Sequence, residues 1–205
     1  KSDDDNVATV DQEGNITAES FGQTNIRIID NNTGNEAQVK VTVLENEEDA
    51  KAYAAVAQTL NTTAVLKEDG TVWTAGDNTN GELGRGNRDK TATYGQVKTS
   101  EYVELTNVIK IAAGQNYFVA LREDGTVWSW GLNNNGQFGT NNTTNSNYAV
   151  QMLAENGTEP ISGIVDIAAG ANHTVVLTNN GEVYQVGNNT NGQFGNWTTN
   201  NSLLP

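Results

Sequence analysis

The chain has 205 residues, of which 36% are hydrophobic and 21 are glycine, so it holds enough apolar material for a globular core. Its formal net charge is -14, and an acidic chain is repelled by nucleic-acid phosphates and by anionic membrane surfaces. Because there is no cysteine and only one histidine, His173, the sequence excludes disulfides, thiolate chemistry and metal sites built on two histidines or a cysteine cluster. We therefore expect no metal, no cofactor, no nucleic-acid partner and, for want of a long apolar run, no membrane insertion.

The first 45 residues are predicted to form about four short strands, in NVATVD, GNITAES, QTNIRIID and EAQVKVTVLE, separated by Gly14, Gly22 and a turn at Asn31–Asn35. The order VATVDQEGNITAESFGQTNIRI followed by VKVTV resembles the C-terminal half of a bacterial immunoglobulin-like domain of group 2. The resemblance implies a spacer or adhesive module of a surface protein. An immunoglobulin-like sandwich needs about seven strands, so residues 1–45 are expected to be a truncated one.

An acidic linker is predicted at residues 46–56, because ENEEDAK runs from Glu45 to Lys51 without strand alternation. Residues 1–49 hold 12 acids and 3 bases, a net charge of -9, and the rest of the chain carries the remaining -5. The N-terminal part is thus the most acidic part of the chain.

Three later stretches can be laid over one another: LKEDGTVWTAGDNTNGELG, LREDGTVWSWGLNNNGQFG and LTNNGEVYQVGNNTNGQFG. A second shared block begins at Ala57, Ala112 and Ala168, which divides residues 57–205 into repeats 57–111, 112–167 and an incomplete 168–205. Spacings of 55 and then 56 residues separate the structural marks of the repeats, which are Gly70, Gly125 and Gly181; Trp73, Trp128 and Tyr184; Gly76, Gly131 and Gly187; and Gly84, Gly139 and Gly195.

Each repeat is predicted to contain a hairpin, since Asp69-Gly70 and its equivalents suit a two-residue type I′ turn. The aromatic residues of the second arm are expected on one common face, as a stacked layer. An apolar residue between two glycine bends, Leu83 in the first repeat, is expected to plug the contact between neighbouring units. Four strands in about fifty residues, without helical periodicity, indicate a propeller blade.

The run IAAGANHTVVL followed by GEVYQVGNNTNGQFG resembles the regulator of chromosome condensation type repeat, whose proteins form seven-bladed β-propellers. The third copy carries the whole pattern, with Gly170, His173 and Leu177, and the resemblance implies a structural role for His173. The second copy has Tyr117 at the histidine position, and the first has Thr59 and Thr62 for the glycine and histidine. The predicted fold is therefore all-β: a partial β-propeller of about three blades after a truncated immunoglobulin-like sandwich.

The search for reactive groups finds no assembled acid, base and nucleophile, so a non-enzymatic role is expected. Glu68-Asp69 and Glu123-Asp124 are explained by turn chemistry, and DNTNGELG offers calcium only Asp77 before Glu82. The 30 asparagines, some of them in glycosylation sequons at Asn15, Asn61 and Asn156, are attributed to compositional bias.

The loops remain as a display surface. Arg85, Arg88 and Lys90 form a small basic group, with a solvated loop as the default interpretation. A long polar loop is predicted from Gly139 to Pro160, and two interpretations stay open for Tyr148, Met152 and Trp197: contact with a partner, or packing on their own blade.

Three functions are compatible with these resemblances. The first is a non-enzymatic recognition or scaffold region of a bacterial surface or secreted protein, located outside the cell and binding a protein or surface ligand. The second is a secreted inhibitor of a cell-wall-related enzyme such as a β-lactamase, as some propellers of this repeat type are. The third and least favoured is guanine-nucleotide exchange on a small GTPase, the activity of the family's nuclear member.

The number of repeats gives one more expectation. Closed propellers usually have four to eight blades, so further blades are expected from a longer chain or from self-association, and the lack of a signal peptide at residue 1 says nothing about location.

Overall fold

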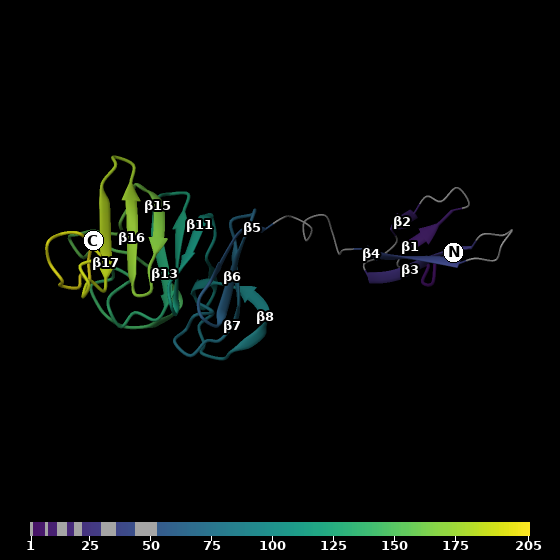
Figure 1. The fold of residues 1–205 in the computed structure, drawn as a ribbon, viewed down its shortest axis with the longest axis horizontal. Helices are drawn as coiled ribbons and strands as arrows, with labels where there is room; N and C mark the ends of the chain where they lie inside the picture. Colours follow the sequence, from purple (N-terminus) through teal and green to yellow (C-terminus); the bar gives the residue numbers. More distant parts are fainter. Residues whose placement is uncertain (1, 7, 12–15, 19–21, 30–35, 44–52) are drawn as a thin grey trace. The chain divides into compact units, whose positions relative to one another are not determined.

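The computed structural model describes residues 2–6, 8–11, 16–18, 22–29, 36–43 and 53–205. The chain divides into two compact parts, an N-terminal part, Lys1–Ala52, and a C-terminal part, Tyr53–Pro205, which are described separately. In the described residues every regular element is a β-strand. Both parts are drawn in Figure 1.

The N-terminal part contains two antiparallel hairpins. Strand β1 (Ala8–Val10) pairs with β2 (Ile16–Ala18), and β3 (Gly22–Ile29) pairs with β4 (Glu36–Val43). Ala8 and Ile26 are buried, and Ser2 bridges to Ile26. The four predicted strands are therefore present, whereas the predicted turn at Asn31–Asn35 and most of the predicted linker lie outside the described residues.

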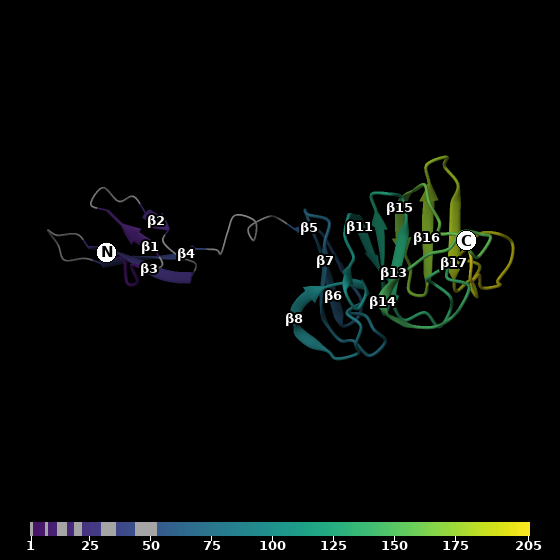
Figure 2. The ribbon, with the colours of Figure 1, turned by 180° about the vertical axis from the view of Figure 1, so that it is seen from behind.

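The C-terminal part is a succession of three antiparallel sheets, in which neighbouring strands are also neighbours in sequence (Figures 1 and 2). The first sheet contains β5 (Tyr53–Gln58), β6 (Thr62–Lys67), β7 (Val72–Gly76) and β8 (Thr91–Gln96). The second contains β11 (Val108–Ala113), β12 (Tyr117–Arg122), β13 (Val127–Gly131) and β14 (Ser146–Gln151). The third contains β15 (Ile164–Ala169), β16 (His173–Thr178) and β17 (Val183–Gly187).

A bridge replaces the fourth strand of the third sheet. Gly187 pairs with Ser202, where Gly76 pairs with Thr91 and Gly131 with Ser146. Between the first two sheets, β9 (Lys98–Ser100) and β10 (Val103–Glu104) form a small separate hairpin. The architecture is an all-β partial propeller of three blades, as predicted.

We call the folded repeats unit 1 (53–107), unit 2 (108–163) and unit 3 (164–205), because their first strands begin at Tyr53, Val108 and Ile164. These strands start before the predicted divisions at Ala57, Ala112 and Ala168, and β5 takes up Tyr53–Val56 from the predicted linker. The predicted divisions follow the shared glycine and ring marks, which lie at the end of the first strand rather than at its beginning.

The hairpin turns lie where the glycines predicted them, but the type I′ assignment is wrong. Gly70 has a φ of +79°, while Asp69 does not have a positive φ. The N–H of Gly70 donates to the Lys67 carbonyl at 3.0 Å, and the N–H of Lys67 donates to the Thr71 carbonyl at 2.9 Å. This is a three-residue loop, a type I turn closed by a left-handed glycine. The Asp69 carboxylate holds it by accepting from the N–H of Thr71 at 2.9 Å.

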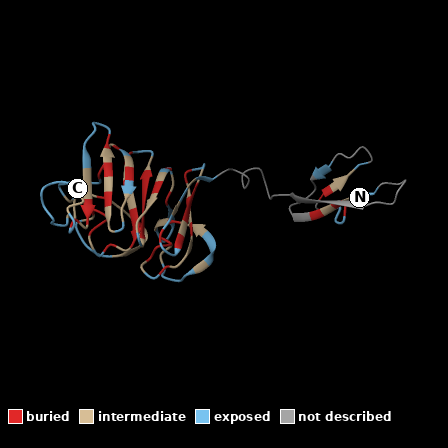
Figure 3. Cartoon of the chain, viewed as in Figure 1, coloured by how far each residue is buried: buried red, intermediate tan, exposed pale blue. Residues whose placement is uncertain are grey.

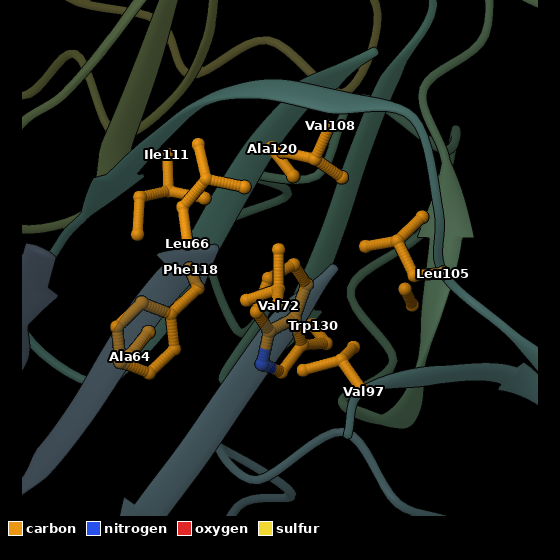
Figure 4. Close-up of a cluster of buried hydrophobic side chains, with 11 residues drawn as sticks. Ala64, Leu66, Val72, Val97, Leu105, Val108, Ile111, Phe118, Ala120 and Trp130 are labelled. Atoms are coloured by element: carbon orange, nitrogen blue, oxygen red, sulfur yellow. The ribbon is translucent and has the colours of Figure 1, made fainter. Parts of the chain in front are cut away.

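Two apolar clusters join the three units. Buried and half-buried residues alternate along the strands, as Figure 3 shows, and the buried apolar ones form the clusters. The first cluster joins Leu66, Val72 and Val97 of unit 1 to Phe118 and Trp130 of unit 2, as Figure 4 shows. The second cluster joins unit 2 to unit 3 through equivalent positions, among them Val127 and Phe138 facing Ile164, Ile167 and Val176. The core of this fold therefore lies between blades.

Candidate binding surface of the repeat units

The hairpin-turn glycines are contact points between units. A Cβ on Gly70 would lie 3.1 Å from the backbone of Asn107, and one on Gly125 would lie 2.9 Å from the nitrogen of Gly163. Asn107 and Gly163 directly precede the first strand of the next unit. A Cβ on Gly181 would have no neighbour within 4 Å. The same predicted mark is thus packed in units 1 and 2 and exposed in unit 3.

The second set of glycines brings two loops of one blade together. A Cβ on any of them would lie 2.4–2.6 Å from a backbone carbonyl oxygen of the loop before the second strand. The following residue donates its N–H to the same carbonyl at 2.8–3.0 Å. The glycines are Gly76, Gly131 and Gly187, and the carbonyls belong to Asn61, Asn116 and Asn172. Only a residue without a side chain allows this approach.

A buried asparagine two residues further on organises the loop that follows, and the sequence analysis missed it. The Nδ2 of Asn133 donates to the carbonyls of Asn142 and Thr144 at 3.0 and 3.2 Å, while its Oδ1 accepts from the N–H of Phe138 at 2.9 Å. Asn78 and Asn189 bind their own loops in the same way and are fully buried too. The available signal was the constant spacing after the second glycine.

The predicted plug residues lie where expected. Leu83 and Phe138 are fully buried, and Phe194 is half-buried. A Cβ on Gly84 would lie 2.9 Å from the ring of Trp130, and one on Gly139 would lie 2.8 Å from Met152, whereas one on Gly195 would have no neighbour within 4 Å. The Nε1 of Trp130 also crosses the contact and donates to the Glu82 carbonyl at 2.8 Å.

The aromatic marks share a face, but the predicted stacked layer is wrong. Trp128 packs on the first cluster and Tyr184 on the second, so each faces the preceding unit. In the described residues the ring contacts join Tyr117 to Phe138, Phe118 to Trp130, and His173 to Phe194. A cation covers each tryptophan instead: Lys67 lies 4.5 Å from the ring centroid of Trp73, and Arg122 lies 5.9 Å from that of Trp128.

The ring position at the start of the second strand differs in each unit. The hydroxyl of Tyr117 crosses to unit 3 and donates to the carbonyls of His173 and Gly170 at 2.6 and 3.2 Å. Burial raises the pKa of the Tyr117 hydroxyl above its ordinary value, so it remains a donor. The half-buried His173 lies next to Phe194, and burial lowers the pKa of its imidazole. Its predicted structural role stays a prediction.

The glycine before each ring is explained by the same geometry. A Cβ on Gly114 would lie 1.9 Å from the ring of Tyr117, and one on Gly170 would lie 2.1 Å from that of His173. Unit 1 has no ring here, and Thr59 takes the glycine position, where its Oγ1 accepts from the N–H of Thr62 at 3.1 Å. The departure of the first copy is therefore a matched pair of changes.

The basic group does not form one patch. The guanidinium of Arg85 turns inward and donates to the carbonyls of Thr74 and Thr93, and burial lowers its pKa. Arg88 is exposed, and its Nη1 donates to the Thr79 carbonyl at 2.9 Å. Lys90 is also exposed. Arg85 is thus a loop brace, and the other two agree with the solvated interpretation.

The structure separates the two interpretations of Tyr148, Met152 and Trp197. Met152 is buried, and Tyr148 lies half-buried with its ring over Gly86. Trp197 is fully exposed and has a φ of +63°. The predicted loop from Gly139 to Pro160 also contains strand β14, so that prediction is wrong for Ser146–Gln151, whose pairing with β13 overrides the polar composition.

A pocket of about 300 Å³ lies between the 154–162 segment and the β16–β17 hairpin, lined by Glu155, Glu182 and Tyr184 among others. The charge of Glu182 is the main cause that raises the pKa of the Tyr184 hydroxyl, and Glu155 adds to it. Thr178 stands where Lys67 and Arg122 stand in units 1 and 2. This pocket therefore combines an aromatic ring and two carboxylates without the cation of the other units.

In the described ranges, no group of three His, Asp or Glu residues lies close enough to hold a metal ion. Nor does any helix in those ranges have the length and apolarity to cross a membrane.

The family model described as "Regulator of chromosome condensation (RCC1) repeat" matches residues 69–121 and 124–177. A second model of the same repeat matches residues 53–82, 108–137 and 164–193. The chain belongs to the RCC1 repeat family. Its N-terminal residues 1–43 match the bacterial Ig-like domain of group 2. Both predicted resemblances are confirmed.

Curated relatives are similar to the repeat region of this chain. The chain is 34% identical over 138 residues to human E3 ubiquitin-protein ligase HERC2, covering 67% of this chain and 3% of that protein. It is 34% identical over 137 residues to the mouse Regulator of chromosome condensation, covering 65% of this chain and 30% of the relative. The chain thus spans less than a third of either relative.

Solved structures have folds similar to that of this chain. Yeast RCC1 (Prp20), determined with Kap60 bound, is 28% identical with a TM-score of 0.55, over 74% of this chain and 32% of the other. Human WBSCR16 has a TM-score of 0.59 at 20% identity, over 75% of this chain and 36% of the other, which shows the fold alone.

Proposed function

We propose that this chain is a non-enzymatic recognition or scaffold region of a multidomain bacterial protein at the cell surface or outside the cell. The repeat blades would bind a protein partner through their loops. The pairing of RCC1 repeats with a bacterial Ig-like domain supports this context. The yeast relative RCC1 (Prp20) was solved with Kap60 bound, which supports a protein as the kind of partner.

The pocket of Glu155, Glu182 and Tyr184 carries the proposal. In units 1 and 2 the equivalent ring is covered by a basic side chain of the protein itself. In unit 3 the ring lies in a pocket of about 300 Å³ with two carboxylates. A lysine or arginine side chain of a partner fits this pocket by cation–π contact and by charge. The partner is therefore a protein with an exposed basic segment.

The test measures binding of the whole chain to immobilised 15-residue peptides of graded net charge by biolayer interferometry. Basic peptides should bind, and Glu182→Gln and Glu155→Gln should each weaken binding about fivefold, the effect of losing about 1 kcal/mol. The exposed Glu101 in the β9–β10 turn gives the control: Glu101→Gln removes the same charge outside the pocket. Equal loss in all three variants, or no preference for basic peptides, would contradict the proposal.

The surface context has a separate test. Antibodies against the RCC1 repeats should bind intact cells that produce the full gene product, and external protease should remove that signal. A signal that appears only after lysis would refute the extracellular placement and leave the peptide-binding proposal to its own assay.

The alternative functions are settled by direct assays of the same chain. Slowed hydrolysis in a β-lactamase assay would favour the inhibitor function. Accelerated release of labelled GDP from a small GTPase would favour nucleotide exchange. Either result would replace the scaffold proposal.

A further inference from the structure

The contact between units 1 and 2 contains an arginine that the protein itself binds. The Nε of Arg122 donates to the Thr106 carbonyl at 2.9 Å, and its Nη1 lies 3.1 Å from a carboxylate oxygen of Asp124. The guanidinium also lies over the ring of Trp128, 5.9 Å from the centroid. A carbonyl, a carboxylate and an aromatic ring thus hold one arginine side chain at this contact.

The contact between units 2 and 3 has counterparts of these groups, 56 residues further along the chain. All of them line the pocket of about 300 Å³ that is the proposed peptide site. The equivalents of Thr106, Asp124 and Trp128 are Ser162, Asn180 and Tyr184. Thr178 takes the place of Arg122 and lines the same pocket. The surroundings of the arginine are therefore repeated, while the arginine is not.

The pocket is open because of the residue at position 178. Threonine is too short to reach over the ring, and Thr178 turns back onto its own hairpin, where its Oγ1 accepts from the N–H of Glu182 at 3.0 Å. The residue is buried in that position. The opening thus lies between two units that the chain contains, and it results from a substitution within the repeat.

The pocket carries two carboxylates, one from each of the two segments that form it: Glu155 and Glu182. The side chains of Asn180 and Tyr184 donate to Oε2 of Glu182 at 3.1 and 3.4 Å, so Oε1 can accept from a ligand. Both glutamates are exposed. A cation placed here therefore meets more negative charge than the single carboxylate that Arg122 contacts.

The arrangement around Arg122 suits a guanidinium better than an ammonium. Its two polar contacts use two different nitrogens, Nε and Nη1, and reach acceptors of two units. A guanidinium is planar, presents its N–H donors as a rigid fork and stacks on aromatic rings, whereas an ammonium is a compact, strongly hydrated point charge. The counterparts of these acceptors also come from two units, since Ser162 belongs to unit 2 and Glu182 to unit 3.

We propose that this pocket binds an arginine side chain of the partner, in the place that Arg122 takes between units 1 and 2. The guanidinium lies over the Tyr184 ring, donates to the Ser162 carbonyl and pairs with the Glu182 carboxylate. This inference rests on the proposed function, because it concerns the same pocket. It narrows the partner from any basic segment to one with an exposed arginine.

The experiment measures binding of the full 205-residue chain to immobilised peptides by biolayer interferometry at about 0.15 M salt. The peptides differ only at one central residue, which is arginine, lysine or citrulline, the neutral isostere of arginine. The arginine peptide should bind about tenfold more tightly than the lysine peptide, because it makes one more charge-assisted hydrogen bond. The citrulline peptide should bind more weakly than either. Free N-acetylarginine amide should compete with the arginine peptide better than N-acetyllysine amide does.

A variant that fills the pocket from within tests the location. Thr178→Arg should occupy the pocket as Arg122 occupies its own contact, and it should lower affinity for the arginine peptide at least about tenfold. Thr143→Arg is the matched control: Thr143 is exposed in a loop of unit 2, outside the pocket, so this variant adds the same charge and should bind like the wild type. The competition measurement needs no variant, so it tests the proposal even where Thr178→Arg does not fold.

Three results would overturn the proposal. Equal affinity for the arginine and lysine peptides, with Glu182→Gln weakening both, would refute the arginine site and leave the proposed function in place. Unchanged affinity in a folded Thr178→Arg variant would show that the arginine binds elsewhere. A chain that binds none of the basic peptides would overturn the proposed function together with this inference.

Discussion

Asn133 gives the sharpest test of how these blades hold their loops. Its side chain is fully buried and makes three hydrogen bonds, two as donor to Asn142 and Thr144 and one as acceptor from Phe138. A net worth of about 1 kcal/mol per bond gives about 3 kcal/mol, and the buried N–H of Phe138, left unpaired, adds about 1–2 kcal/mol. Asn133→Ala should therefore lower the free energy of unfolding by about 4–5 kcal/mol.

The assay is urea denaturation followed by tryptophan fluorescence, since all four tryptophans lie in the repeats. Asn134→Ala, at the exposed neighbouring position, is the control and should change the free energy of unfolding by less than about 0.5 kcal/mol. A similar small change for Asn133→Ala would refute the argument. Asn133→Asp keeps the acceptor but aims a carboxylate at two carbonyls, which raises its folded-state pKa. Its stability should therefore fall as the pH rises.

Three further predictions use the contact between units 2 and 3. Gly114→Ala should destabilise the repeats by at least about 2 kcal/mol in the same denaturation assay, because the new methyl meets the Tyr117 ring and the Gly170 carbonyl. Since Tyr117 is itself fully buried, Gly114→Ala with Tyr117→Thr should lose less stability than the sum of the two single variants. Tyr117→Phe should cost about 1–3 kcal/mol below pH 9. Since the folded-state pKa of this hydroxyl is raised, its contribution is complete below the unfolded-state pKa of about 10 and is lost as the pH rises, so the variant should match the wild type in strong alkali. The hydrogen bond from Lys110 is the main cause that lowers the pKa of Asp166, so this exposed pair should contribute at most about 1 kcal/mol above pH 4 and lose it on acidification, a dependence that Asp166→Asn should remove.

The repeat marks were predictable because a glycine needed for a close approach leaves a fixed spacing in the sequence. Gly70, Gly76 and Leu83 lie at the bends and in the contact that their spacing indicated. The turn type was not predictable, since Asp-Gly suits both a two-residue and a three-residue loop and only the φ of Asp69 separates them. Local pattern therefore located the bends but not their geometry.

The candidate surface was predicted less well, because exposure depends on the neighbouring unit. Met152 and Trp197 were equivalent candidates from sequence, yet one is buried between units and the other is fully exposed. Asn133 was hidden among 30 asparagines, and apart from its constant spacing after the second glycine only its burial distinguishes it. Candidates that look equivalent in the sequence thus take opposite roles, which composition does not reveal.

The β9–β10 hairpin offers a practical consequence. Its ends are joined by the N–H of Leu105 donating to the Val97 carbonyl at 2.9 Å, as Ile161 donates to Met152 at 3.0 Å in unit 2. The extra residue that makes the second spacing 56 instead of 55 lies in the unit 2 counterpart of this hairpin, residues 153–160, since Val97 and Met152 are 55 apart and Leu105 and Ile161 are 56 apart. Natural length variation is thus absorbed where the two ends are already tied. A fluorescent domain or an epitope inserted after the exposed Tyr102 should leave all three blades intact.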